Sequence, residues 1–220
     1  MRVAGPSRFA RRRSWRDAEF VSLDFEATGL DFARDVIVSF GVVPVRGGRV
    51  VLADARHQLV DPDIPPSVSS QKVHELRPQD LAGAPRLDQA RLALREAIRG
   101  RYLLVWYADV EVNFLSAIFG RSAARWRRRT IDVRNLAIEA DGAPSSARTD
   151  FGYGLTSTAG RLGVPVANPH DALDDALVTA QAFLVLAARL SRGVEPTVGD
   201  LVRAAQGPPR RVEQRFKLGV

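Results

Sequence analysis

Two acidic residues, Asp24 and Glu26, interrupt the apolar run FVSLDFEATGL at residues 20–30. Side chains two residues apart leave the same face of a β-strand, so the two carboxylates should lie side by side. On a buried strand they would repel each other and lose hydration, at a large cost in free energy unless a cation compensates. A metal site is one interpretation, and a polar strand face open to solvent is the other.

A second group of acids lies in the segment PHDALDDA at residues 169–176. Asp171 has the position of a helix N-cap, and Asp174 follows three residues later, as in a capping box. Asp175 begins a helix that is apolar nearly all round, so it either needs a partner such as a cation or serves only the helix dipole. His170, just before this helix, is either a base for water, since a free imidazole titrates near neutral pH, or a solvated loop residue.

A third candidate region is VWYADVEVNFL at residues 105–115. Asp109 has the position of a helix N-cap after a buried strand. Glu111 lies in the first turn, where the helix dipole favours an anion and the preceding strand would direct it into a cleft. The spacing alone does not decide which of the two acids binds a metal.

The composition is that of a globular protein with a basic surface: 220 residues, 45% hydrophobic, a formal net charge of +7 and a pI near 10.8. Arginine clusters at residues 11–13, 125–129 and 210–211 suit a polyanion, although a merely solvated basic surface is an equal alternative. The absence of cysteine excludes disulfides and thiolate metal sites and fits a reducing compartment. No apolar run is long enough for a membrane span, so we expect a cytoplasmic protein.

The elements that must position these acids follow from the hydrophobic pattern. Strands are expected at residues 19–27, 36–45 and 49–60, the last two joined by the turn formers Gly47-Gly48, so the first three strands should be antiparallel. Further strands are expected at 101–107 and 130–133, and helices at 87–97, 109–119, 133–140, 155–162 and 171–190. The sequence therefore predicts a mixed α/β sheet of about five strands flanked by helices.

The motifs together resemble one family. DFEATGL, then an acid ahead of Phe114-Leu115, then H-x-x-x-x-D at the start of the last core helix, resemble the DEDDh family of 3′-5′ exonucleases. This is the family of the proofreading epsilon subunit of bacterial DNA polymerase III, ribonuclease T and oligoribonuclease. The resemblance spans about residues 19–190 and implies a ribonuclease H-like fold. Two departures are Glu111, where most relatives have Asp, and Trp106-Tyr107, where many have His-Asn.

The resemblance implies a role for each matched residue. Two ions, Mg²⁺ or Mn²⁺, would be held by four acids, with His170 as general base. The acids are Asp24, Glu26, Glu111 and Asp175, with Asp109 as the alternative to Glu111. The terminal nucleotide would be held by Ala27, Thr28, Leu30 and His74.

The resulting expectation is a metal-dependent 3′-5′ exonuclease that removes nucleoside 5′-monophosphates from single-stranded or frayed DNA 3′ ends. A 3′-5′ exoribonuclease resembling oligoribonuclease is the first alternative, and an impaired nucleic-acid-binding polymerase accessory module is the second. We expect a basic arm at residues 1–17, the exonuclease domain at 18–192 and a tail at 193–220 that is a candidate contact for a DNA polymerase subunit.

Overall fold

The computed structural model describes residues 3–144, 151–191 and 193–206, and its centre is one mixed β-sheet. The strands are β1 (Phe20–Ala27), β2 (Ile37–Arg46), β3 (Arg49–Val50), β4 (Arg56–Leu59), β5 (Tyr102–Val105) and β6 (Thr130–Asp132). Their order is β3-β2-β1-β5-β6, and β4 also pairs with β2. β1 and β2 are antiparallel, whereas β5 and β6 run parallel to β1.

The strand expected at residues 49–60 is divided into two short strands. β3 pairs with β2 at Val45 and Arg46, and β4 pairs with it at residues 39–42. The 3-10 turn η3 (Leu52–Asp54) separates them. Pro44 of β2 lies opposite this interruption, and a proline has no N–H to donate to a neighbouring strand. The expected antiparallel pairing is confirmed, but not the continuous third strand.

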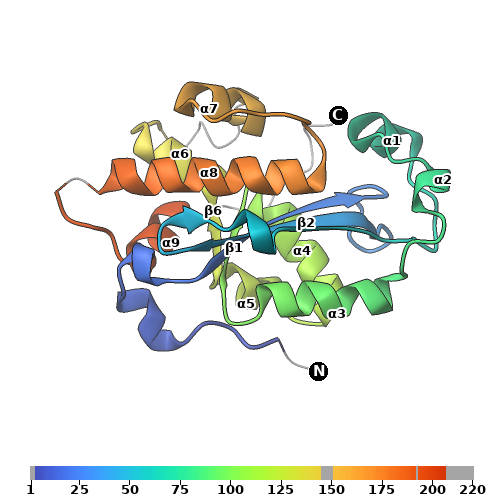
Figure 1. Cartoon of the computed structure of the whole chain (residues 1–220), viewed down its shortest axis with the longest axis horizontal. Helices are drawn as coiled ribbons and strands as arrows, with labels where there is room; N and C mark the ends of the chain where they lie inside the picture. Colours follow the sequence, from blue (N-terminus) through green and yellow to red (C-terminus); the bar gives the residue numbers. More distant parts are fainter. Residues whose placement is uncertain (1–2, 145–150, 192, 207–220) are drawn as a thin grey trace.

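Helices cover both faces of the sheet, as Figure 1 shows. The α-helices are α1 (Val68–His74), α2 (Pro78–Leu81), α3 (Leu87–Ile98), α4 (Ala108–Phe119), α5 (Ala123–Arg127), α6 (Val133–Ala140), α7 (Leu155–Leu162), α8 (Ala172–Leu190) and α9 (Val198–Gln206). Short 3-10 turns are η1 (Arg8–Arg12), η2 (Trp15–Asp17) and η5 (Phe151–Tyr153). The long helix α8 lies along β1 and β2 on one face, and α3, α4 and α5 lie on the other (Figure 1).

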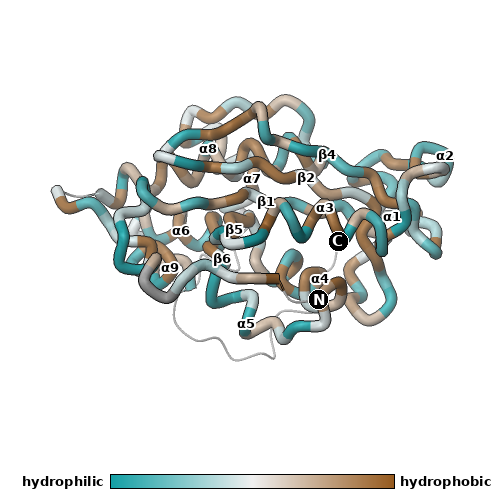
Figure 2. Tube along the Cα trace, turned by 60° about the horizontal axis from the view of Figure 1, so that its bottom comes forward, coloured by the Kyte–Doolittle hydropathy of each residue, from teal (hydrophilic) through white to brown (hydrophobic). Residues whose placement is uncertain are grey.

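The sheet divides the hydrophobic core into two layers. On the α8 face, Phe20 packs against Phe183, with ring centroids 4.9 Å apart. On the opposite face, Phe25 of β1 packs against Phe114 of α4. Figure 2 shows apolar residues gathered along the central strands and polar residues on the outer turns. Alternate residues of β1 thus belong to different layers, which decides where its acids point.

The segment expected as a loose basic arm packs onto the domain over the residues described. Trp15 is 1% exposed and its ring meets Phe183 edge to face, while Val3 is buried in the opposite layer. Ser14 forms a bridge with Thr197, just before α9. Helix α9, within the expected tail, packs against α6 and β6. Burial of Trp15 supplies the free energy that holds the segment in place. Residues 207–220 lie outside the described part of the chain.

None of the helices in the described residues has the length and apolarity that crossing a lipid bilayer requires.

Candidate active site

Asp24 and Glu26 lie on the face of β1 that is covered by α8. Their neighbours Leu23 and Phe25 belong to the opposite core layer, so the alternation of the strand directs both acids toward α8. Asp24 pairs with Gly41 of β2, and Glu26 pairs with Ser39. Both acids are partly buried, and the strand register places them beside the first turn of α8.

Gly41 allows the N-terminus of α8 to rest directly on the sheet. A Cβ atom at this position would lie 2.0 Å from the carbonyl oxygen of Ala172 and 2.4 Å from the nitrogen of Leu173. No side chain fits that space. The glycine therefore sets the distance between β2 and the helix turn that carries Asp175.

The first turn of α8 is fixed by Asp171, which is the N-cap as expected. Its Oδ1 accepts hydrogen bonds of 3.0 Å from the backbone N–H groups of Leu173 and Asp174. Asp174 does not complete a capping box, since the N–H of Asp171 donates to the carbonyl of Asn168. The Asp174 carboxylate instead accepts from the Asn168 side chain at 2.6 Å, which holds the loop before α8.

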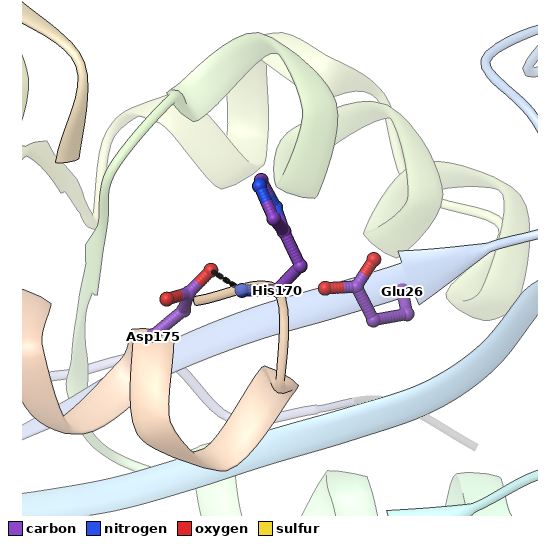
Figure 3. A group of neighbouring side chains, drawn as sticks. All are labelled: Glu26, His170 and Asp175. Carbon is purple, nitrogen blue, oxygen red and sulfur yellow. Dashed lines mark hydrogen bonds between the residues drawn. The ribbon is translucent and has the colours of Figure 1, made fainter. Parts of the chain in front are cut away.

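Asp175, His170 and Glu26 meet at this end of the sheet. Each offers one ligand atom that lies within 4.8 Å of the others. The backbone N–H of His170 donates to Asp175 Oδ2 at 3.1 Å, as Figure 3 shows, and the Glu26 carboxylate lies on the other side of the same loop. His170 has a φ of 67°, in the left-handed region, and its imidazole is exposed. The loop conformation thus brings a titratable side chain next to two carboxylates.

Glu111 reaches the same cluster from α4, on the other side of the sheet edge. It is 3% exposed, and its Oε2 is buried without a hydrogen-bond partner in the described structure. Asp109 points elsewhere and forms an ion pair with Arg127 of α5. The N-cap of α4 is Tyr107, so the expectation that Asp109 caps this helix is wrong. Because the helix begins one residue before Asp109, that acid faces α5 and leaves the cluster to Glu111.

A further acid, Asp132 at the end of β6, lies near Glu111 and holds the start of the helix that carries it. Its Oδ2 accepts from the N–H of Ala108 at 3.2 Å, and its Oδ1 accepts from the N–H of Asn135 at 2.8 Å. Asp132 therefore caps α6 and also holds the first residue of α4. Sequence reasoning missed this residue, although an Asp between a strand and a helix is itself a signal for a cap.

Mutual repulsion and burial raise the pKa values of the acids in the cluster. Burial raises the pKa of Asp24 well above its usual range, with further repulsion from Glu111, Glu26 and Asp175. Burial and the charge of Asp175 raise the pKa of Glu26 to about 8. The pKa of Glu111 is also raised, chiefly by burial, with contributions from Asp132 and Glu26. Four carboxylates in this arrangement are destabilised as anions unless positive charge joins them.

The donor set fits a hard divalent cation. All four acids offer carboxylate oxygens, which are the ligands that Mg²⁺ and Mn²⁺ prefer, and Glu111 Oε2 is a buried acceptor without a donor. A cation would also reverse the unfavourable charge that raises the pKa values. The chemistry available to such a site is hydrolysis at a phosphate, with an adjacent imidazole to take a proton.

The four residues expected to hold a terminal nucleotide differ in accessibility. Leu30 is 64% exposed, whereas Ala27 and Thr28 are buried. The Thr28 hydroxyl donates to Asp35 Oδ1 at 2.8 Å and accepts from the N–H of Val36, so it secures the loop between β1 and β2. The Thr28 side chain is thereby occupied inside the protein.

His74, the last residue of α1, is the fourth residue expected to hold the terminal nucleotide. It is 6% exposed, and its Nδ1 accepts from the N–H of Leu76 at 3.0 Å. Burial lowers its pKa, and the charge of His170 lowers it further, which places the two histidines near each other. A neutral imidazole is therefore the form of His74 at neutral pH.

Gly41 is the second residue that sequence reasoning missed. The available signal was a lone glycine inside a β-rich run, which often marks a close approach of another backbone. The approaching backbone is the first turn of α8, and its relation to the acids follows from the pairing of Gly41 with Asp24. Both contacts join distant segments, so only the fold shows them.

Comparison with known proteins identifies the family. The family described as "Exonuclease" matches residues 21–183, which is most of the chain. The chain belongs to this exonuclease family. Its motifs and relatives are those of the DEDDh type of 3′-5′ exonuclease. The family expectation from the sequence is confirmed.

Two curated relatives place the DEDDh-type domain within much longer proteins. A PolC-type DNA polymerase III of Thermotoga maritima is 31% identical over 169 residues, covering 76% of this chain and 12% of the polymerase. The 3′-5′ exonuclease DinG of Staphylococcus aureus is 25% identical over 170 residues, covering 76% of this chain and 18% of DinG. This chain thus spans under a fifth of the length of these relatives.

Two solved structures share the fold. A complex of E. coli ExoI with single-stranded DNA has a TM-score of 0.66 at 16% identity, covering 80% of this chain and 42% of ExoI. The nuclease domain of 3′hExo, a DEDDh family member bound to rAMP, has a TM-score of 0.63 at 20% identity, covering 84% of this chain and 97% of that domain. The expected ribonuclease H-like mixed sheet with flanking helices is confirmed.

Proposed function

We propose that this chain is a metal-dependent 3′-5′ exonuclease that releases nucleoside 5′-monophosphates from single-stranded or frayed DNA 3′ ends. The observation that carries the proposal is the convergence of acids from three elements, β1, α4 and α8, on one point beside His170. The buried, unpartnered Oε2 of Glu111 is hard to explain without a cation. It also argues against the impaired accessory module, because Glu111 is directed into the cluster despite replacing the usual Asp.

Asp24, Glu26, Glu111 and Asp175 are the residues that would hold two divalent cations, Mg²⁺ or Mn²⁺. When bound, such ions supply Lewis-acid stabilisation of charge on a phosphodiester that is being hydrolysed. The rigid positions of the acids on a strand and two helix ends orient them before substrate arrives. The chain's own contribution is to keep these carboxylates together at a pH where a cation can displace their protons.

His170 is the proposed general base. Its imidazole is exposed on a loop that is tied through its own N–H to Asp175, so the ring stays close to the acids. At neutral pH an imidazole can accept a proton from a water molecule beside the scissile phosphate. His57, whose Nδ1 lies 4.0 Å from Asp171 Oδ2, is on the outer side of the same helix turn and is not needed for this step.

The 3′-terminal nucleotide would lie between the loop after β1 and α1. Leu30 offers an exposed apolar side chain for the base, while the backbone at Ala27 and the ring of His74 line the inner side. Thr28 would act indirectly, by fixing the loop through Asp35. Stacking and backbone contacts of this kind select a free single-stranded end rather than a base sequence.

DNA is favoured over RNA because the two curated relatives described above are named as a DNA polymerase and as the 3′-5′ exonuclease DinG. An exoribonuclease is the alternative that the substrate test must separate. The PolC-type relatives also support a role beside a polymerase, and we place such a protein in the cytoplasm. We also propose that the tail at residues 193–220 contacts a polymerase subunit; its last part, residues 207–220, lies outside the described residues.

The test is degradation of end-labelled single-stranded DNA and of an RNA of equal length, with Mg²⁺, Mn²⁺ or EDTA. The wild-type chain should shorten the DNA from its 3′ end only with a metal, and Asp24→Ala should abolish this. Faster degradation of RNA would select the alternative. Activity in EDTA, or no activity on either polymer, would overturn the proposal.

A further inference from the structure

Two arginine clusters that are more than 100 positions apart in the sequence meet on the surface of the folded chain. Five exposed arginines form what we call the arginine surface: Arg12, Arg13, Arg99, Arg125 and Arg128. They come from the N-terminal segment, the end of α3 and helix α5. In Figure 1 these three elements lie on the side of the sheet opposite to α8.

Hydrogen bonds to backbone carbonyls explain why the clusters meet. The buried Arg129 donates from Nη1 to the carbonyl of Ala4 at 3.0 Å and from Nη2 to the carbonyl of Ile98. The guanidinium of Arg11 donates to the carbonyl of Arg128. Arg99 and Arg128 each adjoin a residue joined by these bonds, and Arg12 follows Arg11. These bonds of Arg11 and Arg129 thus hold the backbone beside Arg12, Arg99 and Arg128 together.

The arginine surface differs from many other surface arginines of the protein in its lack of ion pairs. Many surface arginines elsewhere form ion pairs, including Arg16 with Glu195, Arg77 with Asp80 and Arg203 with Asp200. None of the five forms an ion pair with an acid in the described part of the chain. Glu19, which adjoins this region, is already paired with Arg101. Burial, with a smaller contribution from the charge of Arg121, lowers the pKa of Arg129 to about 10.

We propose that the arginine surface binds the sugar-phosphate backbone of a nucleic acid at a distance from the end that is hydrolysed. This rests on the proposed function. Exposed guanidinium groups without carboxylate partners are available for bidentate contacts with phosphates. Arg99 and Arg128 lie just before the N-terminal ends of β5 and β6, which run parallel to β1. Glu26 lies near the carboxyl end of β1 and Glu111 follows the carboxyl end of β5, so a strand must extend well beyond the active site to reach the arginine surface.

The test compares binding of a long and a short DNA strand by full-length protein in EDTA. One variant is Arg99→Gln/Arg125→Gln/Arg128→Gln. Its matched control, Arg49→Gln/Arg56→Gln/Arg189→Gln, removes the same charge from exposed arginines away from this surface. Binding of labelled strands of about 30 and about 4 nucleotides is measured by fluorescence anisotropy over a range of salt concentrations.

The first variant should bind the long strand about 10- to 100-fold more weakly near 0.1 M salt, and the slope of log K against log salt should fall by about 2. Its binding of the short strand should be unchanged, and the control should keep the wild-type slope. Equal weakening by both variants, or equal weakening on both strands, would overturn the inference. Unchanged binding of the long strand by the first variant would also overturn it.

A separate assay, hydrolysis of the short strand by wild-type protein with Mn²⁺, tests the proposed exonuclease function independently of the arginine surface. If wild type cleaves it but the two variants bind the long strand alike, the arginine surface fails while the proposed function stands. If wild type does not cleave it with any metal, the proposed function fails. Circular dichroism melting of both variants checks that neither result arises from unfolding.

Discussion

Replacing Gly41 by alanine should damage the active site without touching any of its acids. The added Cβ would lie 2.0 Å from the Ala172 carbonyl oxygen, whereas real Cβ atoms essentially never approach closer than 3.0 Å. The first turn of α8 must therefore move away from β2 by about 1 Å. Asp175 travels with that turn, whereas Asp24 stays on β1. A misplacement of this size in a catalytic group costs about 100-fold in rate, and overpacking costs about 1–3 kcal/mol of stability.

The assay is kcat on labelled single-stranded DNA with saturating Mg²⁺, combined with a Mn²⁺ titration and a melting curve. Gly160→Ala is the matched control, because a methyl group added to this exposed glycine of α7 would meet nothing within 4 Å and alanine suits a helix. We expect a large loss of kcat and weaker metal binding for Gly41→Ala only, at temperatures where both variants are folded. A folded Gly41→Ala protein with wild-type kcat and metal affinity would refute this reasoning.

Three further predictions concern the acids. Glu111→Gln should reduce kcat by at least about 100-fold. Asp109→Asn, which weakens the ion pair with Arg127 of α5, should lower the melting temperature and largely spare kcat. The reverse order would show that Asp109 is the second-motif acid. In EDTA, the free energy of unfolding should fall by about 5 kcal/mol, or about 1.4 kcal/mol for each pH unit, as pH rises from 4.5 to about 8, because the unfolded chain loses the Glu26 proton first. Glu26→Gln should flatten that profile in urea titrations, and a rise of stability with pH would contradict it. Asp132→Ala should remove the hydrogen bond that holds the N-terminus of α4 and lower kcat about 10-fold with little change in KM. Asp132→Asn keeps an acceptor for this hydrogen bond and should keep most activity. Equal loss of kcat in both variants would mean that the charge of Asp132, not the hydrogen bond, is what matters.

Local patterns predicted the elements that carry the chemistry. The alternation in β1 placed Asp24 and Glu26 on one face, and the structure shows that this face is covered by α8. Helix α7 has the predicted limits, and Asp171 is the N-cap of α8. These features depend on residues close in sequence, so hydrophobic period and capping chemistry suffice to find them.

Other features depend on contacts between distant segments and could not be predicted locally. Tyr107, not Asp109, caps α4, because Asp132 from β6 holds the N–H of Ala108 and starts the helix earlier. Trp15 lies in the core although its neighbours are arginines, since Phe183 provides an apolar surface for it. The role of Gly41 depends on the strand register and on α8 together.

The bridge between Ser14 and Thr197 joins two segments that are far apart in the sequence. The N–H of Trp15 donates to the carbonyl of Pro196, and the N–H of Val198 donates to the carbonyl of Arg13. Residues 13–15 and 196–198 therefore lie side by side and hold each other through backbone hydrogen bonds. Removing either segment would leave the other without these partners, so both belong to one cooperative folded unit with the central sheet.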